Sequence, residues 1–338
     1  MSRRRPKPTI HDVANAAQVS VPTVSRVLNN RYGVAPQTAA RVQQAILELG
    51  YESSLAARGM RGARTDVIGL IMPDMDHSYA IEVIRGISRA VTGTKYDLLA
   101  MTCGRKLPEE RGVWEQQQIQ RLSGTIVDGI ILVVPDADEF RTDYPLVVVD
   151  PYRQSTACPS VIGANLEGAA AAMNYLTGLG HRRIGFVGGV RHLQSAERRY
   201  QGYTEALAAL DIALDPDLVA TGDFERDGGF MAAQQFFALD DPPTAVFAAN
   251  DESALGVMDA AVAAGLRVPH DLSVIGFDNV PESAFSRPAL TTVDQSISAM
   301  GEAAFDMLIQ LIEGRPLESR IKRIPTQLII RDSCGAPA

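Results

Sequence analysis

The feature that most constrains the fold is an alternation of short apolar runs with longer helical patterns, which begins at residue 66. The runs are rich in Val, Ile and Leu, as is typical of strands buried on both faces. Most are followed by an amphipathic stretch such as NLEGAAAAMNYLTGLG, which predicts parallel sheets covered by helices. The runs lie at 67–72, 96–102, 128–134, 145–150, 183–188, 244–250 and 272–278.

These elements are more numerous than one parallel sheet usually needs, so we expect an α/β body of two Rossmann-like lobes over residues 66–338. The chain should pass between the lobes near Gly163–Asn165 and return after LTTVD (290–294). The expected limits are about 66–163 and 294–321 for the first lobe, and about 164–293 and 322–338 for the second.

The first fifty residues instead predict three short helices. Thr9 and Asp12 are spaced as a capping pair for the first helix, and Ser20 can cap the second, with Pro22 in its first turn. The brief AQVS turn between them is typical of a helix-turn-helix, so residues 1–50 are predicted to be an all-α head.

The third helix should begin at Pro36 and end at Gly50, with Val42, Ile46 and Leu49 facing inward. Residues 51–65, YESSLAARGMRGART, have little to bury and contain three arginines. They predict a linker that is helical only when something supports it.

Charge separates the two parts of the chain. The net charge is -8, yet residues 1–64 contain ten basic and three acidic residues, a net charge of +7 that leaves -15 for the remaining 274. A basic head on an acidic body indicates that only the head approaches a polyanion.

Several classes of protein are disfavoured. MSRRRPKP is followed by no apolar run and no stretch reaches membrane-spanning length, so we expect a cytoplasmic protein that neither enters nor crosses a membrane. Three scattered cysteines, Cys103, Cys158 and Cys334, are typical of reduced thiols. The sequence has no metal-ligand spacing, P-loop or nucleophile elbow. GFVGG is interpreted as a turn. The five histidines lie mostly beside turns and are expected to be solvated. We therefore expect no catalytic residue, metal or cofactor.

Short polar side chains follow several of the predicted strands: Asp74, Asp150, Asn250 with Asp251, and Asp278. Open parallel sheets bind ligands beyond the carboxyl ends of their strands, so two facing lobes would bring these residues to one cleft. Any one of them alone could equally cap the next helix or turn. As a set they favour a ligand site.

The segment TIHDVANAAQVSVPTVSRVLNN resembles the N-terminal signature of the lactose/galactose-repressor (LacI/GalR) family of transcription regulators, and RVQQAILELGY resembles its third helix. SAERRYQGY, FAANDESALG, LSVIGFDN, LTTVDQ and IPTQLIIRDS follow in the family's order, so the likeness covers essentially the whole chain. It implies a periplasmic-binding-protein-like body and a recognition helix that begins near Ser20.

By this resemblance, the recognition helix has no carboxylate because it enters the major groove between phosphates. Val21 and Pro22 occupy the variable positions that face base edges, and Met60 matches a hinge residue that wedges into the minor groove. Asn29 could instead cap the helix end. The residues implied to bind DNA are Thr9, Ser20, Val21, Pro22, Thr23, Ser25, Arg26, Asn29, Arg58, Met60 and Arg61.

The resemblance also implies an effector pocket. Arg199 matches an arginine whose fork suits paired hydroxyls or a carboxylate, and Phe224 an aromatic that stacks on a sugar ring, although it could simply pack at a turn. The residues implied to bind the effector are Asp74, Tyr79, Asp150, Arg199, Phe224, Asn250, Asp278 and Gln295.

Three positions depart from the family pattern. Gln18 replaces the usual glycine of the recognition turn, which predicts strain or a different bend. YESS replaces Tyr-x-Pro-Asn, so Ser53 or Ser54 would cap the hinge, and DHSY, with His77 and Ser78, replaces an Asn-Pro-aromatic run in the first-lobe wall of the pocket.

We therefore expect a homodimeric regulator that binds double-stranded operator DNA, most simply a repressor of carbohydrate genes whose operator affinity is switched by a small sugar. One alternative is a regulator with a non-sugar co-repressor such as a nucleobase. Another is a sugar-binding protein or an enzyme with an incidental basic head. The effector, the operator and the sign of regulation stay open.

Overall fold

The computed structural model has two compact units, which are described separately. The first comprises Met1–Val67 with Arg121–Asp128, and the second Ile68–Gln120 with Gly129–Ala338. The residues that the structure describes are 8–28, 32–51, 64–104, 106–137, 140, 142–153, 158–191 and 193–337.

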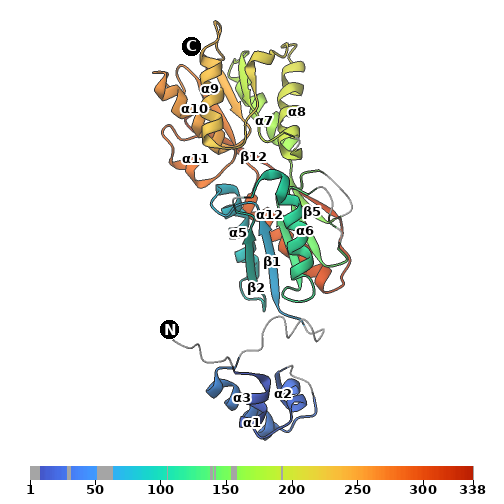
Figure 1. Ribbon diagram of the computed structural model, residues 1–338. Coiled ribbons are helices and arrows are strands. Elements are labelled where there is room, and N and C mark those ends of the chain that lie inside the picture. The colour runs from blue at the N-terminus through green and yellow to red at the C-terminus, as the bar shows by residue number, and fades with distance from the viewer. Residues whose placement is uncertain are drawn as a thin grey trace. The chain divides into compact units, whose positions relative to one another are not determined.

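The head contains the three predicted helices: α1 (Ile10–Ala16), α2 (Val21–Leu28) and α3 (Pro36–Leu49) (Figure 1). The predicted capping pair is confirmed, because Thr9 N donates to Asp12 Oδ2 at 2.7 Å and Asp12 N to Thr9 Oγ1 at 3.4 Å. Pro36 begins α3, and Gly50 ends it in the left-handed conformation (φ 61°). Local capping chemistry therefore sets the limits of these helices.

The core of the head is small. Its buried side chains are three valines and three alanines, among them Val24, Val42 and Ala45, and Ile46 packs against them. The prediction for Leu49 was wrong, since this side chain is 37% exposed. It lies in the last turn of α3, and a core of such short side chains does not extend to cover it.

The turn between α1 and α2 has a backbone conformation that favours glycine, although a glutamine occupies it. Gln18 has φ 53°, in the left-handed region that disfavours side chains with a Cβ. The strain expected at Gln18 is therefore present in this turn.

The first sheet of the body has the strand order β11-β5-β4-β3-β1-β2. From β11 to β1 the neighbours are parallel. α12 (Ile297–Ile312) contacts the middle of this sheet and packs along α5 (Ser78–Val91), and α6 (Pro108–Leu122) precedes β3. The strands are β1 (Val67–Met72), β2 (Asp97–Thr102), β3 (Gly129–Val133), β4 (Leu146–Val149), β5 (Ser160–Gly163) and β11 (Ile321–Ile324).

The second sheet has the order β12-β10-β9-β8-β6-β7 and is covered by helices on both sides (Figure 1). Ala245 and Phe247 of β8 face the cluster under α7 and α8, whereas Val246 and Ala248 face the cluster under α9 and α10. The strands are β6 (Ile184–Val187), β7 (Val219–Ala220), β8 (Ala245–Ala248), β9 (Ser273–Asp278), β10 (Thr291–Asp294) and β12 (Gln327–Ile329). The helices are α7 (Asn165–Gly178), α8 (Gln194–Ala208), α9 (Arg226–Phe237), α10 (Asp251–Ala263), α11 (Pro281–Phe285) and a 3₁₀ turn at Pro216–Leu218.

Two Rossmann-like lobes are thus confirmed, and all seven predicted strands are present. Five short strands were missed: β5, β7, β10, β11 and β12. None of them forms a continuous apolar run: β7 has two residues, and β5, β10, β11 and β12 read SVIG, TTVD, IKRI and QLI. β12 also runs antiparallel to β10, which departs from the parallel pattern expected.

The chain passes between the two sheets three times: after Gly163, after Asp294, and between Ile324 and Gln327. Because β11 pairs with β5, Ile321–Ile324 belong to the first sheet. Within the described ranges, no helix is both long enough and apolar enough to cross a membrane.

His181 contradicts the expectation of solvated histidines. It is 1% exposed, and its ring nitrogens lie 2.8 Å from Thr244 Oγ1 and 2.8 Å from the carbonyl oxygen of Gly335. Burial lowers its pKa, which keeps the ring neutral. It holds the C-terminal segment against the second lobe.

Candidate functional site

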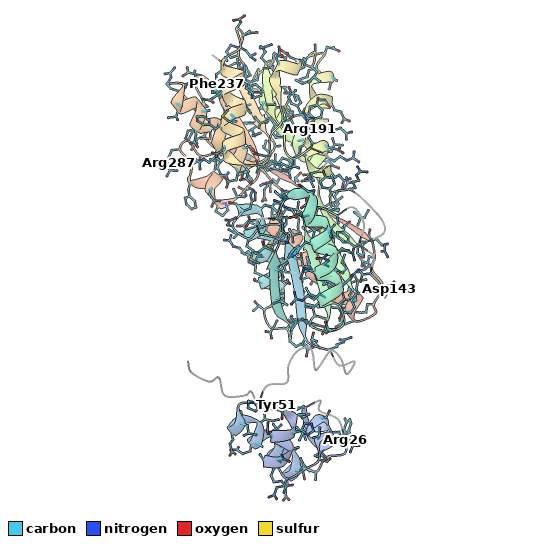
Figure 2. All side chains as sticks on the ribbon, viewed as in Figure 1. Arg26, Tyr51, Asp143, Arg191, Phe237 and Arg287 are labelled. Atoms are coloured by element: carbon cyan, nitrogen blue, oxygen red, sulfur yellow. The ribbon has the colours of Figure 1, made fainter. Side chains whose placement is uncertain are left out.

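In the head, α2 separates its core side from its polar side. Val24 is buried, whereas Ser20, Pro22 and Arg26 are exposed, and Figure 2 shows Arg26 on this unit (Figure 2). Val21, Thr23 and Ser25 are half-buried, and Thr9 is exposed beside α1. Ser20 Oγ lies 2.9 Å from Thr23 Oγ1 and accepts from Thr23 N at 3.4 Å, which confirms Ser20 as the cap. The remaining predicted positions, Asn29, Ser53, Ser54, Arg58, Met60 and Arg61, lie outside the described residues.

In the body, both lobes contribute to one cavity of about 250 Å³. Seven of the eight predicted effector residues line it. Gln295 is the exception and lies behind Asp278. The lining residues are Pro73, Asp74, His77, Tyr79, Ala80, Arg111, Val133, Val134, Asp150, Leu193, Ser195, Arg199, Asp223, Phe224, Glu225, Asn250 and Asp278.

Arg199 is held by several protein groups. The side chain comes from α8 and is 3% exposed. Its Nε donates to Asn165 Oδ1 at 2.9 Å, its Nη1 donates to the carbonyl oxygen of Ala249, and its guanidinium lies 3.9 Å from the ring centroid of Phe277. Two hydrogen bonds and a cation–π contact therefore hold the guanidinium in one orientation.

Two buried carboxyl groups of the cavity, Asp278 and Asp150, are both affected by the charge of this guanidinium. Asp278 Oδ1 lies 3.4 Å from Arg199 Nη1 and accepts from Gln295 Nε2 at 2.5 Å. Burial raises the pKa of Asp278 to about 6, although Arg199 opposes the shift. Burial also raises the pKa of Asp150, again against Arg199. The cavity therefore has strong acceptors in excess of its buried positive charge.

Phe224 is held in a strained position. Its φ is 70°, and its carbonyl oxygen accepts from Asn250 Nδ2 at 2.8 Å. Asn250 Oδ1 also accepts from Ser253 N, so the capping interpretation of Asn250 holds alongside its place in the cavity wall. On the other side, a Cβ added at Gly189 would lie 2.0 Å from the Phe224 ring. Gly189, the last glycine of GFVGG, therefore makes room for the ring of Phe224.

The first-lobe wall is less tightly bonded. The hydroxyl of Tyr79 is buried and, within the described part of the chain, has no hydrogen-bond partner. Burial, followed by the charges of Asp150 and Asp278, raises the pKa of Tyr79 well above its usual value. Asp74 accepts a hydrogen bond from Met75 N, as expected of an aspartate that stabilises a turn. A buried hydroxyl without a partner indicates room for a polar ligand group.

Several lining residues escaped prediction. Ser195 lies in SAERR, and His77 caps α5 within DHSY, so both had a signal in the sequence. Arg111 lies in the first turn of α6 and had none. Asp251, expected at a strand end, does not line the cavity and is fully buried behind it.

Comparison with known proteins finds a family match for the head and one for the body. Residues 9–54 match "Bacterial regulatory proteins, lacI family", and residues 173–334 match "Periplasmic binding protein-like domain". The HTH-type transcriptional repressor CytR of Escherichia coli (strain K12) is 35% identical over 329 residues, which cover 97% of this chain and 96% of CytR. PurR of Vibrio cholerae (serotype O1, strain M66-2) is 33% identical over 334 residues, with 96% and 97% covered.

Solved structures show the same architecture. The lac repressor dimer bound to operator and the anti-inducer ONPF superposes with a TM-score of 0.83 at 28% identity, covering 98% of this chain and 100% of that one. The regulator CelR in complex with cellobiose gives 0.70 at 29% identity, with 96% and 99% covered. The chain belongs to the lacI family of bacterial regulatory proteins. It is a DNA-binding transcriptional regulator with a periplasmic-binding-protein-like body.

Proposed function

We propose that this chain is a homodimeric repressor whose affinity for operator DNA is switched by a small neutral sugar bound in the body cavity. The observation that carries the proposal is the meeting of Arg199, Asp278 and Phe224 in one cavity. A guanidinium donates to ring hydroxyls, a carboxylate accepts from them, and an aromatic face covers the apolar side of the ring. Cellobiose occupies the related CelR, which supports a sugar in this chain.

Charge narrows the class of sugar. The lining has five carboxyl groups and two arginines, so a phosphate group would be repelled there. The carboxyl groups are those of Asp74, Asp150, Asp223, Glu225 and Asp278, and the arginines are Arg111 and Arg199. We therefore expect neutral sugars to bind better than their phosphates.

For DNA, we propose that two heads read a near-palindromic operator in adjacent major grooves, with Thr23, Ser25 and Arg26 at bases and phosphates and Val21 and Pro22 at base edges. Thr9 and Ser20 would support the docking, and the predicted roles of Asn29, Arg58, Met60 and Arg61 stay as sequence predictions. The lac repressor neighbour is a dimer on its operator, which supports this arrangement. Such a regulator acts in the cytoplasm, and we propose no catalytic activity.

The test begins with selection of an operator from random duplexes by the purified full-length chain. Glucose, galactose, ribose and cellobiose are then titrated against labelled operator, beside glucose 6-phosphate as the matched anion. We expect one neutral sugar to weaken operator binding and to raise the melting temperature of the protein, because it binds the native state. Absence of any preferred duplex would overturn the proposal for the head, and sugars without effect would overturn it for the pocket.

A second candidate is a nucleobase that acts as co-repressor. Two aromatic residues, Tyr79 and Phe224, line the same cavity, and a planar base could stack on either. The same assay separates the candidates, since a co-repressor tightens operator binding and an inducer loosens it. By linkage, operator DNA must change the affinity for that ligand by the same factor.

A further inference from the structure

The turn that presents Asp278 to the cavity is strained. Asp278 and Asn279 are consecutive non-glycine residues with positive φ, 116° and 59°. Side chains with a Cβ disfavour this region, so such a turn persists only where its surroundings hold it in place. Gln295 and Arg199 contact the carboxylate of Asp278 itself, and neither bonds to the backbone that follows it.

One group that holds this backbone is the carboxylate of Asp251, the first residue of α10. Asp251 is 0% exposed, accepts from Val280 N at 2.9 Å and accepts from the hydroxyl of Thr292 at 2.5 Å. A Cβ at Gly276 would lie 2.3 Å from Asp251 Oδ1, so the strand beside it is shaped around this carboxylate. Burial raises the pKa of Asp251 well above its usual value.

The other group is Arg331, in the C-terminal segment IPTQLIIRDS. Its Nη2 donates to Asn279 Oδ1 at 2.6 Å, and its Nη1 donates to the carbonyl oxygen of Leu290 at 2.6 Å and to Ser283 Oγ at 3.1 Å. Arg331 N donates to Thr291 Oγ1 at 3.0 Å. One guanidinium thus joins the strained turn to the segment that leads into β10.

Neither Asp251 nor Arg331 lines the cavity. We propose that they are positioning residues for the effector site, which hold the turn at Asp278–Asn279 so that the Asp278 carboxylate faces the ligand and Arg199. The bond between Arg331 and Asn279 is the decisive contact, because it fixes the residue next to Asp278. The expected effect on ligand affinity rests on the proposed effector function. The expected effect on the position of the Asp278 carboxylate rests on the geometry alone.

The test uses the full-length chain and two variants that break this bond from either side. Arg331→Ala removes the guanidinium, and Asn279→Gly removes the acceptor while keeping a residue that accepts a positive φ. Thr291→Val is the matched control, because it removes the hydroxyl that accepts from Arg331 N and leaves the Asn279 bond intact. Arg331→Lys retains the charge without the fork and should restore only part of the effect.

Two readouts are measured: the pKa of Asp278, from ¹³C-labelled aspartate by NMR without ligand, and the dissociation constant for cellobiose, glucose and ribose by calorimetry. We expect Arg331→Ala and Asn279→Gly to move the pKa of Asp278 in the same direction and to weaken sugar binding about tenfold, with the double variant no weaker than Arg331→Ala. Thr291→Val should stay within about twofold of the wild type.

Variants that only melt at lower temperature, while the pKa of Asp278 and sugar affinity stay unchanged, would overturn the inference and leave Arg331 a purely structural role. If the wild type binds none of the sugars, the proposed sugar function fails, and the pKa readout still decides the positioning role. An unchanged pKa in Asn279→Gly overturns it in that case as well.

Discussion

Two arginines show how differently the two units use the same side chain. Arg26 in the head is exposed on α2, beside a cluster of helices whose described buried side chains are valines and alanines. Arg199 in the body is 3% exposed and is fixed by Asn165, Ala249 and the ring of Phe277. An exposed arginine can still adapt to a polyanion, whereas a buried one is already oriented for a small ligand. If both arginines bind as proposed, the head presents an adaptable group to DNA, whereas the body presents a fixed one to its ligand.

Arg26→Ala is the substitution expected to have the largest effect. It should weaken operator binding by about 10–100-fold, because an arginine that contacts a base or phosphate is worth about 1–3 kcal/mol. Sugar affinity should not change, since Arg26 belongs to the other compact unit. Fluorescence anisotropy on operator and on random DNA, with calorimetry for sugar, checks both halves. Equal loss of sugar affinity would break the separation between the units.

Gly189→Val tests the opposite half of the comparison. Its Cβ would meet the Phe224 ring at 2.0 Å, so the ring must leave its place. We expect sugar affinity to fall about tenfold while operator affinity without sugar stays the same. Gly178→Ala is a suitable control, because nothing lies within 4 Å of a Cβ at that helical glycine. Intact sugar binding in Gly189→Val would show that Phe224 is not a ligand contact.

How far the sequence predicted each region follows from what its residues must do. The head was predicted closely, because capping residues such as Thr9, Pro36 and Gly50 act within one helix turn. The cavity was predicted in its lining, because Asp150 and Asp278 follow buried strands whose ends converge. Contacts between distant segments were not predictable. The bond from Arg331 to Asn279 joins residues 52 positions apart, and no local pattern encodes it.

The pH dependence of the body provides a third test. Burial raises the pKa of Asp278 from its ordinary 3.8 to about 6, so the folded protein holds this proton more tightly than the unfolded chain. Between these values the stability contributed by Asp278 therefore falls as pH rises, by linkage. Sugar binding should change in the opposite sense and strengthen up to about pH 6, because the ionised carboxylate is the better acceptor.

Calorimetry from pH 5 to pH 8 measures how sugar affinity depends on pH in the wild type and in Asp278→Asn. We expect the wild type to lose up to about tenfold in affinity per pH unit below its pKa, and the variant to show a flat profile with weaker binding throughout. Operator binding without sugar should not follow the same curve, because Asp278 lies in the body. An identical acid limb in Asp278→Asn would assign the titration to another carboxyl group of the cavity.

The smallest expected effect compares backbone strain in the two units. Gln18 in the head and Asp211 in the body both hold positive φ, 53° and 55°. Replacing each with glycine relieves strain, and the glycine's extra freedom in the unfolded chain offsets part of the gain. We expect Gln18→Gly to stabilise the head by about 0.5–1 kcal/mol, and Asp211→Gly to change the body less, because aspartate tolerates the left-handed region better than glutamine. Hydrogen exchange of amides in α1 and in α8 measures the two changes in one full-length protein. A head that loses stability in Gln18→Gly would mean that the glutamine side chain, and not the turn it strains, secures the approach of α2 to α1.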